Sequence, residues 1–144
     1  MEKKNIDWAN LGFNYVKTDY RFVSNFKNGA WDEGALITDD TVTISECAGV
    51  LQYAQTVFEG LKAYTTEDGH IVTFRPDLNA ERMVNSALRL EMPAFPAERF
   101  IDAVIKTVEA NAAFVPPYGS GATLYIRPYM FGSNAVIGVK PADE

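Results

Sequence analysis

The chain has 144 residues, enough for one domain, and its 47% hydrophobic and 22% charged residues are typical of a folded globular protein rather than a disordered one. A net charge of −6 without any cluster of Lys or Arg argues against nucleic-acid binding, because phosphate contacts need a basic surface. The sequence predicts no membrane span and no secretory signal, and its single cysteine, Cys47, cannot form an internal disulfide, so a cytoplasmic location is expected.

The first half of the chain predicts an arm followed by short strands and one short helix. These elements are an arm at 1–19, a strand at 20–26, a hairpin turn at Asn28-Gly29 with a return strand from Ala30, a β-branched strand at 41–45 and a helix at 48–55. The Asn-Gly pair is the strongest of these signals, because a tight hairpin turn needs positive φ at its central residues.

The second half predicts a hairpin, two helices and a final strand. These elements are strands at 60–65 and 70–74, a helix capped by Asp77 or Asn79 and running to about Leu90, a second helix beginning at Pro96, a strand at 122–130 and a loose tail from 132. Together the elements predict an α+β domain, a mostly antiparallel sheet with about two flanking helices. The small domain is expected at 20–134, and 135–144 is expected to begin a linker.

Two arginines, Arg75 and Arg127, stand in apolar, strand-rich stretches directly before a proline. The planar fork of an arginine binds carboxylate or phosphate through paired hydrogen bonds. At its position Arg75 is able to hold a phosphate or to pair on the surface with Asp77 or Glu81, and the pattern leaves both open. Arg127 shares a strand face with Tyr125, so the two offer a fork and a hydroxyl to a substrate carboxylate, unless the arginine simply reaches into solvent from an edge strand.

The other ionisable residues give weaker signals. Lys62 alternates with Tyr64 on a hairpin strand and is expected to be solvated or ion-paired, whereas a Schiff-base lysine needs a desolvated amine. The only histidine, His70, lies near a turn without a second histidine, so no metal site is expected.

The chain resembles the branched-chain amino acid aminotransferases, fold-type IV enzymes that use pyridoxal 5′-phosphate (PLP). The resemblance rests on the order of these segments: Tyr53, Phe58-Glu59-Gly60, Phe74-Arg75-Pro76, Asn79, Arg82-Met83 and Tyr125-Ile126-Arg127-Pro128. It implies that Arg75 binds the PLP phosphate. It also implies that Tyr125 and Arg127 lie near the substrate carboxylate, with the arginine favouring the second carboxylate of glutamate or 2-oxoglutarate.

The same resemblance implies pocket aromatics for an aliphatic side chain at Tyr53, Phe58 and, in the arm, Phe13. The family's Schiff-base lysine belongs to a larger second domain, and none of the seven lysines here lies in a matching position. No catalytic residue is therefore expected in this chain, which on its own is expected to be inactive.

The resemblance implies the small N-terminal domain of a homodimeric enzyme that transfers the amino group of Leu, Ile or Val to 2-oxoglutarate. A non-catalytic dimerisation or binding module is the alternative. Within the enzyme class, D-amino acid aminotransferase and aminodeoxychorismate lyase share the fold, but the long arm and the Tyr125-Ile126-Arg127-Pro128 segment favour the branched-chain type.

Overall fold

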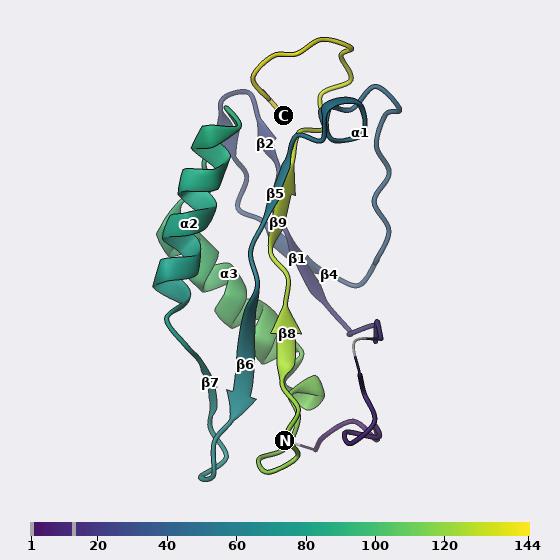
Figure 1. The fold of residues 1–144 in the computed structure, drawn as a ribbon, viewed down its shortest axis with the longest axis vertical. Coiled ribbons are helices and arrows are strands. Elements are labelled where there is room, and N and C mark those ends of the chain that lie inside the picture. The colour runs from purple at the N-terminus through teal and green to yellow at the C-terminus, as the bar shows by residue number, and fades with distance from the viewer. Residues whose placement is uncertain (1, 13) are drawn as a thin grey trace.

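A computed structural model of the chain describes residues 2–12 and 14–144. It shows an α+β fold in which two long helices lie side by side along one side of a narrow antiparallel ribbon (Figure 1). The predicted fold class is confirmed. The elements in chain order are β1 (Arg21–Val23), β2 (Phe26–Lys27), β3 (Ala30–Trp31), β4 (Ala35–Ile37), α1 (Gly49–Tyr53), β5 (Thr56–Phe58), β6 (Leu61–Thr65), β7 (Ile71–Thr73), α2 (Pro76–Arg89), α3 (Ala97–Ala110), the 3₁₀ turn η1 (Ala112–Phe114), β8 (Leu124–Ile126) and β9 (Tyr129–Phe131).

The central ribbon consists of β5 paired with β9, continued by β7-β6-β8, all antiparallel. The single strand predicted at 122–130 is wrong, because it divides into β8 and β9 around Arg127-Pro128. Proline has no N–H to give to a ladder, so pairing stops there. On the facing segment of the ribbon, Glu59 and Gly60 separate β5 from β6. The Glu59 N–H donates to the Pro128 carbonyl at 2.8 Å. We call these two facing breaks the joint.

The core lies between the ribbon and the helices. Alternate residues of the ribbon are buried, and they meet the apolar faces of both helices. The main members are Val57, Leu61, Ala63, Met83, Ala87, Phe100 and Val104. Full burial of one such large side chain is worth about 1.5–3 kcal/mol, so this layer is the principal source of stability.

Helix α2 begins at least two residues earlier than the sequence predicts. Pro76 occupies its first turn and Arg75 is the cap residue, so the predicted caps Asp77 and Asn79 both lie inside the helix. The fixed φ of proline suits the first helical position, which explains the earlier start. Helix α3 begins at Ala97, with Pro96 as its cap rather than its first residue.

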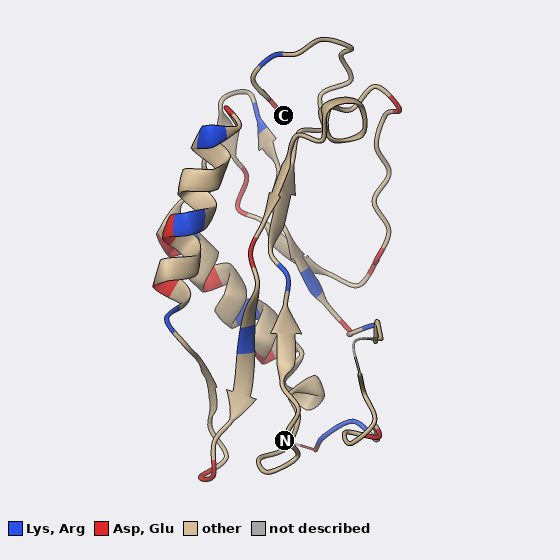
Figure 2. Cartoon of the chain, in the orientation of Figure 1, with Lys and Arg blue, Asp and Glu red and all other residues tan. Residues whose placement is uncertain are grey.

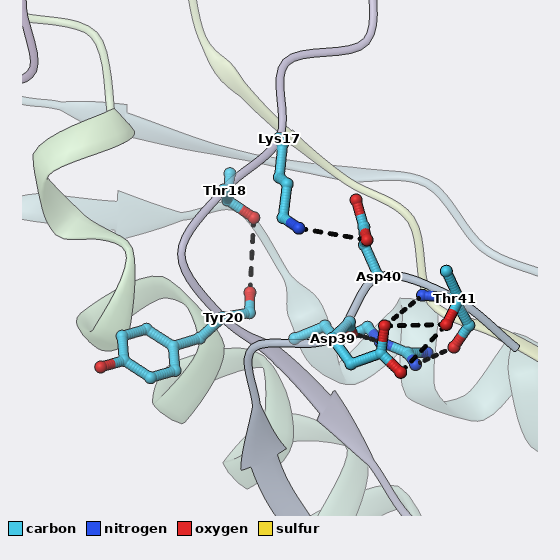
Figure 3. Close-up of polar contacts among 7 residues, drawn as sticks. Lys17, Thr18, Tyr20, Asp39, Asp40 and Thr41 are labelled. Carbon is cyan, nitrogen blue, oxygen red and sulfur yellow. Dashed lines mark hydrogen bonds and ion pairs between the residues drawn. The ribbon is translucent and has the colours of Figure 1, made fainter.

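The N-terminal hairpin at Asn28-Gly29 is confirmed, with φ values of 54° and 80°. The strand predicted at 41–45 is wrong, because β1 pairs instead with β4. The Arg21 side chain donates hydrogen bonds to the backbone carbonyls of Asp39 and Thr41, which a strand would otherwise use for pairing. Asp39 also accepts the Thr41 N–H at 2.9 Å, which bends the segment into a turn (Figure 3).

The segment after β9 folds back on itself. The buried Asn134 side chain accepts the N–H groups of Asp143 and Glu144, and the Ser133 N–H donates to the Glu144 carbonyl. The domain boundaries at 20–134 and 135–144 stay predictions. In residues 2–12 and 14–144 no helix is long and apolar enough to cross a membrane.

Candidate functional site

Phe58, Tyr125 and Arg127, which the sequence predicts to bind substrate, lie together at the joint. The Arg127 guanidinium carbon is 4.4 Å from the centre of the Phe58 ring and 5.1 Å from that of Tyr125. Arg127 also donates from Nε at 3.1 Å and from Nη2 at 2.8 Å to the Tyr125 hydroxyl. These contacts bring Tyr125 and Arg127 together as predicted, although Arg127 lies just past the end of β8. We call the three residues the Arg127 cluster.

Gly60 leaves the space that the Tyr125 hydroxyl occupies. A Cβ atom at position 60 would lie 2.4 Å from that oxygen and 3.1 Å from the ring carbon that bears it. Real Cβ atoms do not approach other atoms so closely, so any side chain here must displace Tyr125. The steric role of Gly60 is absent from the sequence predictions, although a glycine at a strand interruption is a known signal of close approach.

The Arg127 cluster is part of an apolar surface on the side of the ribbon away from the helices. Directly opposed residues of antiparallel strands share a face, and here Phe58 opposes Tyr129, Lys62 opposes Tyr125, and Tyr64 opposes Val72. The aromatic members remain exposed: 61% for Phe58, 51% for Tyr129 and 44% for Tyr125. An exposed patch of this kind marks a binding or packing surface.

A hollow of about 1570 Å³ borders the cluster, and its lining includes Tyr125 and Arg127 but neither Phe58 nor Arg75. Ligand pockets usually measure about 300–1000 Å³, so the hollow, which the ribbon, α3 and residues from 6–45 line, is a gap between these parts of the fold rather than a shaped pocket. The site is therefore defined by its side chains.

Arg75 lies in the turn between β7 and α2, with a φ of 45°. Its half-exposed guanidinium holds the Asp77 carboxylate, with Nη2–Oδ2 at 2.7 Å and Nε–Oδ1 at 3.0 Å. These hydrogen bonds and the opposite charge lower the pKa of Asp77 and raise that of Arg75. Of the two surface partners left open by the sequence, the structure pairs Arg75 with Asp77.

Glu59 points away from the Arg127 cluster, toward α2. Its carboxylate is 9% exposed and accepts Arg82 Nη2 at 2.7 Å, Arg82 Nε at 3.1 Å and Asn79 Nδ2 at 2.8 Å. Burial alone would raise the pKa of Glu59, but the hydrogen bonds from Arg82 and Asn79 and the charge of Arg82 outweigh it and hold the pKa below 4.5. Acidic and basic residues are interspersed along α2 (Figure 2). The Glu59 side chain therefore faces the helix layer rather than the Arg127 cluster.

Helix α2 connects the Arg75 turn to the joint. Arg75 caps the helix, and Asn79 lies four residues later, which is about 6 Å along the helix axis. Asn79 donates to the Gly60 carbonyl at 3.2 Å as well as to Glu59. The turn that carries Arg75 therefore lies about one helical turn from the joint, which adjoins the Arg127 cluster.

The remaining predicted residues are less well placed. Tyr53 is the last residue of α1 and is 41% exposed, and within the described ranges it makes no hydrogen bond or ring stacking with the Arg127 cluster. Phe13 lies outside the described residues. Lys62 is exposed on the ribbon, and His70 lies 3.5 Å from Asp68 at a hairpin tip. In the part of the chain that the structure describes, no His, Cys, Asp and Glu side chains group as metal ligands do.

The sequence is similar over almost its whole length to known aminotransferases. It is 55% identical over 141 residues to a branched-chain-amino-acid aminotransferase of Haemophilus influenzae, covering 98% of this chain and 41% of that protein. It is 43% identical to a methionine aminotransferase of Arabidopsis thaliana, covering 97% and 40%. The chain thus spans about two fifths of the length of the curated relatives that it matches. No model of a protein family matches it.

Solved structures of branched-chain aminotransferases have the same fold. The enzyme of the archaeon Thermoproteus uzoniensis, solved with norvaline, superposes with a TM-score of 0.59 at 28% identity, over 83% of this chain and 36% of that one. A second such enzyme superposes with a TM-score of 0.67 at 27% identity, over 88% and 37%. Related structures of that second enzyme contain N-(5′-phosphopyridoxyl)-L-glutamate or 4-methylvaleric acid. The predicted resemblance to the branched-chain aminotransferases is confirmed, for a segment about two fifths as long as those proteins.

Proposed function

We propose that this chain is the small N-terminal domain of a PLP-dependent branched-chain amino acid aminotransferase, a cytoplasmic homodimer. The observation that carries the proposal is that the joint beside the Arg127 cluster is hydrogen-bonded to α2 at Asn79, about one helical turn from Arg75, the cap of that helix. The sequence similarity to enzymes of this name supports it.

The residues of the β7–α2 turn fit the phosphate of PLP. Arg75 presents a fork that already holds a carboxylate, and the turn opens a 14-residue helix whose first N–H groups favour an anion. When bound, PLP supplies the electron sink for amino-group transfer. The task of this chain is to hold the phosphate at Arg75, with Asp77 giving up its place on the fork.

The Arg127 cluster fits both substrates of such an enzyme. The rings of Phe58 and Tyr125 offer apolar surface to an aliphatic side chain, while Arg127 offers N–H donors to the second carboxylate of glutamate or 2-oxoglutarate. Tyr53 and Phe13 are proposed as further pocket aromatics. The methionine aminotransferase among the relatives suggests that an unbranched thioether belongs in the same substrate class.

The proposal predicts that the 144-residue chain does not transaminate alone, since the Schiff-base lysine lies in the second domain. The test compares this chain with the full-length enzyme that contains it, using leucine and 2-oxoglutarate with PLP. Borohydride reduction followed by mass spectrometry should trap PLP on the full-length enzyme and not on Lys62. Stoichiometric labelling of the isolated chain, or a full-length enzyme inactive toward leucine, would contradict the proposal.

A further inference from the structure

The Glu59 carboxylate connects the strand joint to the helix that carries Arg75. It accepts hydrogen bonds from two residues on the same side of α2, Asn79 and Arg82, which are three positions apart. Neither helical partner belongs to the Arg127 cluster. We call Glu59, Asn79 and Arg82 the clamp.

The clamp reaches the Arg127 cluster through the backbone. Phe58 directly precedes Glu59, and Gly60 directly follows it and forms the floor under the Tyr125 hydroxyl. The Glu59 N–H bonds the Pro128 carbonyl, next to Arg127. A shift of residue 59 therefore moves both strands on which the cluster is built.

The geometry points to Glu59 as a positioning residue that sets where the Arg127 cluster lies relative to the Arg75 anion site. This inference rests on the proposed function, because it assigns the two ends of the clamp to substrate and cofactor. Three features of the clamp suit this role better than general stabilisation. The carboxylate is buried, Arg82 binds both of its oxygens and so fixes its orientation, and Asn79 bonds both the side chain of Glu59 and the carbonyl of Gly60.

The experiment uses the full-length enzyme with Glu59→Asp, which keeps the charge but shortens the reach, and Glu59→Gln, which keeps the length but loses the charge. The readouts are the dissociation constant of PLP, and kcat/KM for leucine divided by that for glutamate. The ratio is insensitive to the fraction of folded enzyme, so a purely structural loss leaves it unchanged. Displacing reacting groups by about 1 Å costs up to a hundredfold in rate, so we expect both readouts to change by about fivefold or more.

Asn111→Ala is the matched control. Asn111 is 2% exposed and bonds Tyr20 and Thr107, so its loss destabilises the fold through partners outside the clamp and the site. We expect this variant to lower the melting temperature while both readouts stay within about twofold of the unmodified enzyme. If the Glu59 variants do not fold, Arg82→Lys keeps the charge but removes the fork, and it should shift the readouts in the same direction.

The inference is overturned if the clamp variants lower only the melting temperature, or if Asn111→Ala changes the ratio and the PLP constant as much as they do. Failure of the unmodified enzyme to transaminate leucine overturns the proposed function instead. In that case the PLP dissociation constants of the variants relative to the unmodified protein still decide the inference.

Discussion

The guanidinium of Arg127 lies over the ring of Phe58, with 4.4 Å between the guanidinium carbon and the ring centre. Its contacts with the Tyr125 hydroxyl use Nε and Nη2, whereas a guanidinium carries five N–H donors. Donors therefore remain for a ligand carboxylate. The two rings hold the cation in place in advance, which lowers the entropy cost of binding.

Arg127→Ala in the full-length enzyme is expected to reduce kcat/KM for glutamate about tenfold or more, because hydrogen bonds to a charged group are worth about 1.5–3 kcal/mol. The effect on leucine should be smaller, since its side chain carries no carboxylate. Steady-state kinetics with both amino donors measures the difference. Equal losses for the two substrates would refute the role given to Arg127, and Arg127→Lys should recover only part of the glutamate activity because it lacks the fork.

Arg75→Ala is expected to weaken PLP binding about tenfold or more, because a charged hydrogen-bond donor to the phosphate is lost. Absorbance titration of the apoenzyme with PLP gives the dissociation constant. Arg89→Ala serves as the matched control, since Arg89 is also an exposed arginine of the α2 region but lies in the last turn of the helix. A PLP affinity unchanged by Arg75→Ala would show that the phosphate does not bind at this turn.

Asp77→Asn should have the opposite effect on PLP. The Asp77 carboxylate now pairs with the Arg75 fork at 2.7 Å, so its neutralisation frees the fork for phosphate. An ion pair between exposed side chains is weak, which limits the gain in affinity to about fivefold or less. Weaker PLP binding by Asp77→Asn would show that this carboxylate supports the site rather than competing for it.

Gly60→Ala is expected to destabilise the enzyme by about 1–3 kcal/mol, the usual cost of overpacking, because the added Cβ collides with Tyr125. Combining it with Tyr125→Phe removes the closest contact, so the double variant should be less destabilised than the sum of the single changes. Urea unfolding of all four proteins measures this coupling. Gly138→Ala is the control, since a Cβ there meets only Val136 at 4.0 Å. Strict additivity would contradict the steric role of Gly60.

Glu59→Gln should reduce stability by about 1–2 kcal/mol near neutral pH, because a buried carboxylate loses its charge-assisted bonds. The pKa of Glu59 in the folded state lies below its ordinary value of 4.5, so its ionised form stabilises the fold above that pH. This contribution is lost as the pH falls through the folded-state pKa. The difference in melting temperature between the variant and the unmodified enzyme should therefore shrink below about pH 4.5. A difference that is constant or grows in acid would contradict the assignment.

Much of this arrangement follows from local sequence signals. The Asn28-Gly29 turn, the hairpin of β6 and β7 and the two long helices are set by turn chemistry and periodicity. The proximity of Tyr125 and Arg127 is what the two-residue repeat of a strand predicts, although Arg127 lies just past the end of β8. Such features depend on residues close together in the chain, so a single sequence suffices to predict them.

Other features depend on contacts between distant residues. No strand forms at 41–45, because the Arg21 side chain donates to the carbonyls of Asp39 and Thr41, which lie 18 and 20 residues further along the chain. The orientation of Glu59 reflects Arg82 on a separate helix. In both cases the sequence contains the charged residues, but only the tertiary fold selects the partners. The interruption of the ribbon at the joint, in contrast, has a local signal in Pro128, since proline interrupts a ladder.

Three consecutive residues at the joint differ sharply in how much change they should tolerate. Phe58 leaves most of its ring uncovered, Glu59 is held on three sides, and Gly60 has no free volume. A library randomised at position 58 should therefore yield many folded proteins with altered substrate preference, whereas one randomised at 59 or 60 should yield few. Efforts to redesign the side-chain pocket would do best to vary residue 58 and leave its two successors unchanged.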